Sequence, residues 1–136
     1  MSQVLTDRVA IVTGAGRGIG KACALRFAIE GARLVISDIN FENVSRVADE
    51  ITSSGGVATA IKTDISDEND VNAMVEVALK QYGTIDILLN NASKFGEIVM
   101  KTWDSLTVEE WKELLSVNVI GLWLCCKAAV PAMKKK

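Results

Sequence analysis

Histidine is absent from this chain of 136 residues, and cysteine occurs only three times. Without histidine, and with Cys23 far from the adjacent Cys125 and Cys126, the sequence offers no plausible zinc site, so we expect no bound metal. An odd number of cysteines is a poor disulfide framework, and free thiols indicate a reducing, cytoplasmic setting. Cys125 and Cys126 are therefore interpreted as small apolar helix residues.

A strong charge of either sign is also missing. The 15 basic and 17 acidic residues give a net charge of −2, which argues against nucleic acid or an anionic membrane as the main partner. Residues 1–7 lack the pattern of a signal peptide. The apolar stretch 117–133 contains Asn118, Lys127 and Pro131, and we judge it too short and too interrupted to cross a bilayer.

Short apolar runs alternate with helical patterns along the whole chain. Strands are predicted at 9–13, 34–38, 57–61 and 85–89. Helices are predicted at 18–30, after Asn40 until Ser53, after Asp67 until Tyr82, and after Thr107 towards the end. The predicted N-caps of the last three helices are Asn40, Asp67 and Thr107. Strands with consecutive apolar residues favour a parallel sheet covered on both faces. The predicted fold class is α/β, an incomplete doubly wound sheet forming a single domain over 1–136.

Glycines gather between the first strand and the first helix, in Thr13-Gly14-Ala15-Gly16-Arg17-Gly18-Ile19-Gly20. Glycine lets the backbone turn sharply and lets a pyrophosphate approach without meeting a Cβ, while the helix N-terminus offers free N–H groups. The spacing is GxxxGxG, because Ile19 stands where the common GxGxxG pattern has its third glycine. No Gly-Lys-Ser/Thr is present, which argues against an NTP-hydrolysing P-loop. The alternative is a glycine-rich turn that binds no ligand.

An acidic residue ends the second strand, 18 residues after Gly20. The carboxylate of Asp38 can accept both ribose hydroxyls of an adenosine and would repel a 2′-phosphate, which favours NAD over NADP in a Rossmann-type site. Arg17 favours NADP more weakly, because a cation beside the glycines could pair with a phosphate. The alternative for Asp38 is a helix N-cap. Its neighbour Ile39 is included among the predicted cofactor residues.

Taken together with three later motifs, the glycine turn resembles the short-chain dehydrogenase/reductase family. The further motifs are Asp64-Ile65 after the third strand, Asn90-Asn91-Ala92-Ser93 after the fourth, and Asn118 in the last helical tract. All four occur in the family's order and spacing, over nearly the whole chain. Ser93 departs from the family, which has glycine there, so the loop beside the cofactor ribose is expected to be slightly displaced.

The resemblance implies roles for these motifs. Asp64 and Ile65 would contact the adenine ring, although Asp64 could instead cap a turn with Ser66. Asn91, with Ala92 and Ser93, would meet the nicotinamide-side ribose, whereas Asn90 could be purely structural. Asn118 matches an asparagine of the family's catalytic tetrad that helps to hold a water in a proton relay; the alternative is an exposed polar residue.

The catalytic serine and Tyr-x-x-x-Lys of that family are absent from these 136 residues. The only tyrosine, Tyr82, is followed four positions later by Asp86. We therefore predict an NAD-binding portion of an oxidoreductase acting on an alcohol or ketone that cannot catalyse by itself. The alternatives are a non-catalytic dinucleotide-binding module and an NADP-dependent ketoacyl-type reductase.

Two surface features are predicted as well. The fourth strand would leave an open sheet edge, so homo-oligomers are expected through that edge or through the last helical tract. Trp103, Trp111 and Trp123 are predicted to pack in the core or at an interface.

Overall fold

The computed structural model describes residues 3–95 and 101–136, so part of the predicted loop from Asn90 to Ser105 lies outside the described residues. The elements follow one another as β1 (Val9–Thr13), α1 (Gly18–Ile29), β2 (Arg33–Asp38), α2 (Phe41–Ser53), β3 (Val57–Lys62), α3 (Glu68–Tyr82), β4 (Ile87–Leu89), α4 (Val108–Leu115), the π-helical segment η1 (Ser116–Gly121) and α5 (Leu122–Met133). The predicted alternation of strands and helices is confirmed.

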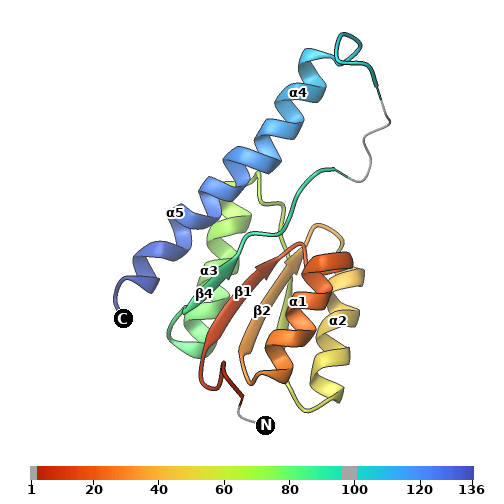
Figure 1. The fold of residues 1–136 in the computed structure, drawn as a ribbon. Coiled ribbons are helices and arrows are strands. Elements are labelled where there is room, and N and C mark those ends of the chain that lie inside the picture. Colours follow the sequence, from red (N-terminus) through yellow and green to blue (C-terminus); the bar gives the residue numbers. More distant parts are fainter. Residues whose placement is uncertain (1–2, 96–100) are drawn as a thin grey trace.

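The four strands form one parallel sheet in the order β3-β2-β1-β4. Helices α1 and α2 cover one face of the sheet, and α3 lies with α5 on the other (Figure 1). The chain therefore winds outward to β3 and then crosses back over β1 to reach β4. That reversal between β1 and β4 is the topological switch point where doubly wound sheets open to ligands.

The strand sequence explains the two layers. Every residue of β1 is buried, and successive side chains point to opposite faces of the sheet. Ala10 and Val12 pack in the cluster under α1 and α2, whereas Ile11 packs in the cluster under α3 and α5. A run of apolar residues without alternation is thus the pattern expected of a central parallel strand.

The predicted helix starts are confirmed by side-chain capping. Asn40 accepts a hydrogen bond from the amide of Asn43 at 3.0 Å, and Asp67 accepts from the amides of Asn69 and Asp70. Thr107 and Glu110 form a reciprocal capping box at the start of α4. These caps satisfy amides that a helix leaves unpaired at its first turn.

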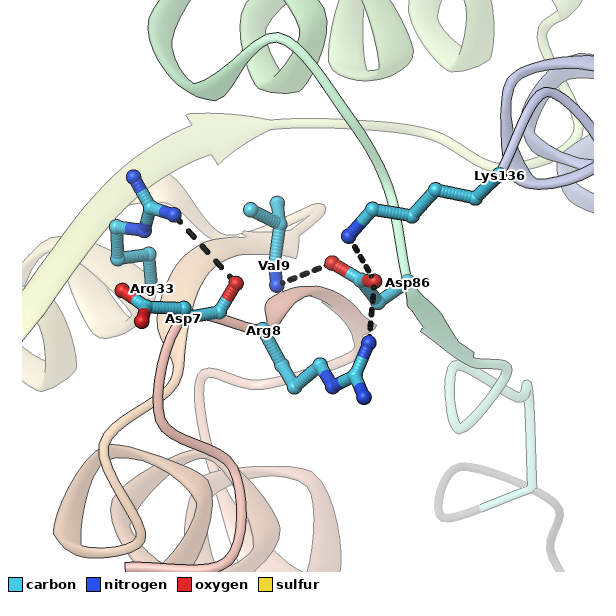
Figure 2. Close-up of polar contacts among 6 residues, drawn as sticks. All are labelled: Asp7, Arg8, Val9, Arg33, Asp86 and Lys136. Atoms are coloured by element: carbon cyan, nitrogen blue, oxygen red, sulfur yellow. Dashed lines mark hydrogen bonds and ion pairs between the residues drawn. The ribbon is translucent and has the colours of Figure 1, made fainter.

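The fourth strand is shorter than predicted, because Ile85 and Asp86 are not part of it. Ile85 is fully buried, but Asp86 uses its carboxylate, which accepts a hydrogen bond from the amide of Val9 at 2.9 Å (Figure 2). The side chains of Arg8 and Lys136 also donate to this carboxylate. The backbone amide of Asp86 also donates to the carbonyl oxygen of Val9 at 2.8 Å, so backbone and side-chain contacts together join this position to β1 ahead of the strand.

The tryptophans are not in the core of the described chain, which corrects one half of the prediction for them. Trp103, Trp111 and Trp123 are 87%, 51% and 54% exposed. Helix α4 has no buried residue at all, and it extends away from the sheet (Figure 1). Its apolar residues Val108, Trp111 and Leu115 are therefore exposed.

Taken together, α4, η1 and α5 make one helical tract, Val108–Met133, of 26 residues. By length and composition alone this tract could cross a membrane, which corrects the judgement made on 117–133 alone. Such a helix is weak evidence, because core helices of soluble proteins pass the same test. Here Leu124, Cys125 and Ala129 are buried in the cluster formed with α3, so the last half of the tract is part of the fold.

Candidate functional site

The turn between β1 and α1 brings backbone very close to backbone. Gly14 and Gly18 have φ values of +66° and +57°, a region that favours glycine. A Cβ on Gly14 would lie 2.7 Å from the Cα of Ala92, and one on Gly20 only 2.2 Å from the carbonyl oxygen of Gly14. At Gly18 the same position is open, with nothing within 4 Å. Close backbone contacts thus explain the glycines at 14 and 20, and the positive φ explains the glycine at 18.

Asn91 ties this turn to the end of β4. Its Nδ2 donates to the carbonyl oxygens of Thr13 and Gly14, at 3.1 and 3.0 Å. The backbone amides of Asn91 and Ala92 in turn donate to the Thr13 hydroxyl, at 3.1 and 3.0 Å. The side-chain amide hydrogens of Asn91 are thereby used inside the protein, and the Thr13 hydroxyl is a positioning group that the sequence did not reveal.

Asp38 lies directly beside the glycine turn. Its Oδ2 accepts from the amide of Gly16 at 2.9 Å, and its Oδ1 accepts from the amide of Asn40 at 2.9 Å. The alternative role as a helix N-cap is wrong, because Asn40 caps α2. Each carboxylate oxygen has a further lone pair, so the group is held in place and can still accept hydrogen bonds from a ligand.

Asp64 and Ile65 follow β3 at the same edge of the sheet. Oδ1 of Asp64 accepts from the amide and the hydroxyl of Ser66, at 2.9 and 2.6 Å, so the predicted turn does form. Ile65 is only 5% exposed and packs against Gly121, where a Cβ would lie 2.8 Å from its side chain. The glycine in η1 therefore lets the last helical tract approach this loop.

Asn118 lies within η1 and binds the backbone of the loop after β4. Its Oδ1 accepts from the amide of Lys94 at 2.8 Å, and its Nδ2 donates to the Lys94 carbonyl at 3.3 Å. The alternative of an exposed polar residue is thus wrong, because Asn118 is partly buried and doubly bonded. Asn90 contacts the last helical tract through its Nδ2, which donates to Sγ of Cys126 at 3.4 Å.

A cleft of about 720 Å³ opens along the carboxyl ends of the strands. Every predicted cofactor residue except Gly16 and Gly20 lines it: Gly14, Arg17, Gly18, Ile19, Asp38, Ile39, Asp64, Ile65, Asn91, Ala92 and Ser93. Asn118 does not line the cleft but holds its wall through Lys94. Gly16 and Gly20 shape the turn behind it.

The sequence did not single out several other residues of this wall. Lys94 and Phe95 line the cleft from the loop after β4, and Glu113 and Ser116 line it from the last helical tract. Lys94 and Glu113 form an ion pair that joins the two walls. This ion pair links residues 19 positions apart in the sequence, so no local pattern could reveal it.

Cys125 lies buried in α5. Burial, followed by the charge of neighbouring Cys126, raises the pKa of Cys125 to about 11. A thiol with such a pKa stays protonated at neutral pH and is a poor nucleophile. This agrees with the prediction of Cys125 as a small apolar helix residue.

The cleft fits an adenine dinucleotide in three respects. Open space beside Gly18 leaves room for a pyrophosphate at the N-terminus of α1, and Asp38 offers acceptors for ribose hydroxyls. The third respect concerns Thr63, which lines the cleft and is 3% exposed. Its hydroxyl has no hydrogen-bond partner in residues 3–95 and 101–136, so it is available to bond a ligand. A doubly wound parallel sheet with a glycine turn at its switch point defines a Rossmann-type fold.

Comparison with known proteins assigns the family. The short chain dehydrogenase family profile matches residues 8–136, and the chain belongs to that family. The chain is 38% identical over 133 residues to cyclohexanol dehydrogenase of Acinetobacter sp. (strain SE19), covering 98% of this chain and 52% of that protein. It is 37% identical over 131 residues to 7alpha-hydroxysteroid dehydrogenase of Escherichia coli (strain K12), covering 96% and 50%.

Two solved structures of this family share the fold of this chain. A 3-ketoacyl-(acyl-carrier-protein) reductase from Brucella melitensis, complexed with NADH, superposes with a TM-score of 0.89 at 40% identity, covering 96% of this chain and 52% of that one. A short chain dehydrogenase/reductase from Burkholderia phymatum in complex with NAD has a TM-score of 0.89 at 29% identity, covering 95% and 45%. The chain thus spans about half the length of the relatives it matches.

Proposed function

We propose that this chain is the NAD(H)-binding portion of an oxidoreductase that moves a hydride between NAD and an alcohol or ketone. The observation that carries the proposal is the Asp38 carboxylate, fixed by the amide of Gly16 beside the phosphate turn and lining the cleft. In that place it would accept the ribose hydroxyls, while Gly14, Gly18 and Ile19 surround the pyrophosphate. NAD supplies the hydride acceptor, and the protein supplies its binding and orientation.

The structure favours NAD over NADP on electrostatic grounds. A 2′-phosphate would meet the Asp38 carboxylate at contact distance, where like charges repel. Arg17 also lines the cleft and could pair with a phosphate, which keeps an NADP-dependent ketoacyl-type reductase as the second candidate. The similarity to a 3-ketoacyl reductase complexed with NADH supports that reaction class while it leaves NADH as the preferred cofactor.

The redox step requires groups that these 136 residues do not contain. The only tyrosine, Tyr82, packs between α3 and the sheet, and its hydroxyl bonds Thr59 and the Leu34 carbonyl. Without a general acid–base pair, turnover falls about 10²–10⁴-fold. We therefore propose that this chain alone binds NADH but does not turn over alcohols or ketones at a useful rate. A non-catalytic binding module is the alternative, and the mass of the native gene product distinguishes the two.

Further parts of the proposal concern the setting of the site. Asn91 and Asn118 would act by holding the walls of the cleft, and Ala92 and Ser93 would face the nicotinamide-side ribose. We place the protein in the cytoplasm, in keeping with free cysteines and bacterial relatives. We also propose that it forms homo-oligomers through the exposed apolar side of its last helical tract.

The test is a fluorescence titration of the purified chain with NADH and NADPH. Wild type binds NADH saturably and more tightly than NADPH. Asp38→Ala weakens NADH binding about 10- to 150-fold, the equivalent of about 1.5–3 kcal/mol for hydrogen bonds to a charged group, and removes the preference over NADPH. Asp49→Ala, an exposed carboxylate on α2, serves as the matched control and leaves both affinities unchanged. Folded wild-type protein without saturable NADH binding contradicts the proposal.

A further inference from the structure

The loop between β3 and α3 holds Asp64 more firmly than a turn requires. We propose that Ser66 and Asp70 are positioning residues that aim the Asp64 carboxylate, so that the site selects adenine over a purine with an oxo group at position 6. This inference rests on the proposed function, because it concerns the adenine end of the same cleft. Asp64, Ile65 and Ser66 all line that cleft.

The first contact fixes which carboxylate oxygen is available. Oδ1 of Asp64 accepts two hydrogen bonds from Ser66, from its hydroxyl at 2.6 Å and from its amide at 2.9 Å. Within residues 3–95 and 101–136, no hydrogen bond reaches Oδ2 of Asp64. Rotation of the carboxylate would break both bonds, so Oδ2 remains the acceptor for an incoming donor.

The second contact fixes the backbone that carries the carboxylate. The amide of Asp64 donates to Oδ2 of Asp70 at 2.9 Å, across six positions of the chain. Asp70 itself lies in the first turn of α3, where its amide bonds the N-cap Asp67. The loop is thus closed on a rigid helix end rather than left to move with its own turn.

These contacts have a chemical consequence for base selection. An ionised carboxylate only accepts hydrogen bonds. Adenine carries a 6-amino group that donates, whereas hypoxanthine carries a 6-oxo group that would meet Oδ2 as another acceptor. A carboxylate that cannot turn away therefore discriminates between the two bases, and a carboxylate free to rotate discriminates less.

The experiment compares the dissociation constants of two probes, NADH and the reduced hypoxanthine analogue of NAD, for the full chain. Wild type prefers NADH. Ser66→Ala and Asp70→Ala each lower this preference about fivefold or more, because each removes one hydrogen bond to or from Asp64. Ser66→Thr retains the hydroxyl, and Asp70→Asn retains an acceptor, so both restore the preference.

Glu68→Ala is the matched control, because it also removes a carboxylate from the first turn of α3. It breaks the ion pair of Glu68 with Lys127, but it leaves the Asp64 carboxylate and its contacts with Ser66 and Asp70 in place. The preference therefore stays at the wild-type value in this variant. A ratio that falls equally in Glu68→Ala shows that loss of any carboxylate from this helix end is sufficient, and it overturns the inference.

The remaining outcomes separate this inference from the proposed function. Unchanged ratios in Ser66→Ala and Asp70→Ala overturn the inference while NADH binding stands. Equal dissociation constants of the two probes for wild type likewise overturn the inference and leave the proposed function in place. Failure of folded wild type to bind NADH overturns the proposed function together with the inference that rests on it.

Discussion

The carboxylate of Asp86 joins three separate parts of the chain (Figure 2). Its side chain is only 6% exposed, and it accepts hydrogen bonds from the amide of Val9 and from the side chains of Arg8 and Lys136. The start of β1, the entry to β4 and the end of the last helical tract therefore meet at one buried anion. Hydrogen bonds to a charged group are stronger than neutral ones, which makes this a stabilising contact.

Asp86 predicts a specific loss of stability in acid. Burial acts to raise the pKa of Asp86, but the hydrogen bonds from Lys136, Val9 and Arg8 outweigh it and hold the pKa below its usual value. A depressed pKa contributes stability that is present above the unfolded value of about 3.9 and lost as pH falls through the lower folded value. Asp86→Asn should be less stable than wild type by about 1–3 kcal/mol at pH 7.

Thermal unfolding from pH 7 down to pH 2.5 checks this expectation. The gap between wild type and Asp86→Asn should narrow below about pH 4. Asp49→Asn, at an exposed position of α2, should follow wild type throughout. A gap of constant size over the whole range contradicts the argument.

At the scale of single residues, the sequence predicted most of the residues that line the cleft, but not the contacts that these residues make inside the protein. Asp38 was predicted from its place at the end of the second strand, and Asp64 and Asn91 were predicted from the family resemblance; all three line the cleft. The partners of Asn91 were not predictable, since its contacts with Thr13 cross from β4 to β1. The role of Asn118 in holding Lys94 was hidden for the same reason.

Among the elements, α4 depends unusually on its own N-terminus. It buries none of its eight residues, so packing adds little to its stability. The capping box of Thr107 and Glu110 supplies two hydrogen bonds at its start, at 3.2 and 2.8 Å. Local capping therefore decides how often this helix frays.

Removal of that cap gives the prediction at this scale. Thr107→Ala should destabilise α4 by about 1 kcal/mol, which raises the amide exchange rates of its first turns about fivefold. Hydrogen exchange measured on α4 and on β1 separates a local effect from a global one. Thr102→Ala, in the loop before α4, is the control; equal exchange in Thr107→Ala and wild type contradicts the prediction.

Local patterns identified the elements but not their irregular parts. The caps at Asn40, Asp67 and Thr107 could be predicted from the sequence because each side chain bonds an amide two or three residues away. The π-helical segment η1 was not predicted, since one wider turn hardly alters a helical apolar pattern. The close contact of Gly121 with Ile65 accompanies it, and that contact depends on the position of a distant loop.

At the scale of the whole molecule, the last helical tract has two different sides. Ala129 and Leu124 face the core, whereas Trp111, Leu115 and Val119 are 51%, 48% and 56% exposed. Exposed apolar side chains along one helix are typical of an interface. The outer edge of β4 is also unpaired within the described ranges, where the sheet ends at that strand.

Self-association through that side is the prediction at this scale. Wild type should sediment as an oligomer at high concentration, and Trp111→Glu should shift it towards the monomer, because the substitution places a charge among apolar side chains. Ile29→Glu is the matched control, since Ile29 is an exposed apolar residue on α1 in the opposite layer. A wild type that stays monomeric at high concentration contradicts the proposal.

The general architecture followed from the sequence, because parallel strands and crossover helices allow few arrangements. The order of the strands, and hence the cleft between β1 and β4, required the glycine turn and the family resemblance as well. The membrane-length helical tract shows the limit of reading one segment alone. The burial of its last half against α3 and the sheet is a property of the assembled fold.

Asn91 has one more consequence for this assembled fold. Its side-chain amide lies between the ends of β1 and β4, where the winding direction of the sheet reverses. It donates hydrogen bonds to the carbonyl oxygens of Thr13 and Gly14. A nucleotide bound at the turn would therefore also stabilise the contact between β4 and β1. The affinity for the cofactor and the stability of the β1–β4 pairing are thus expected to change together.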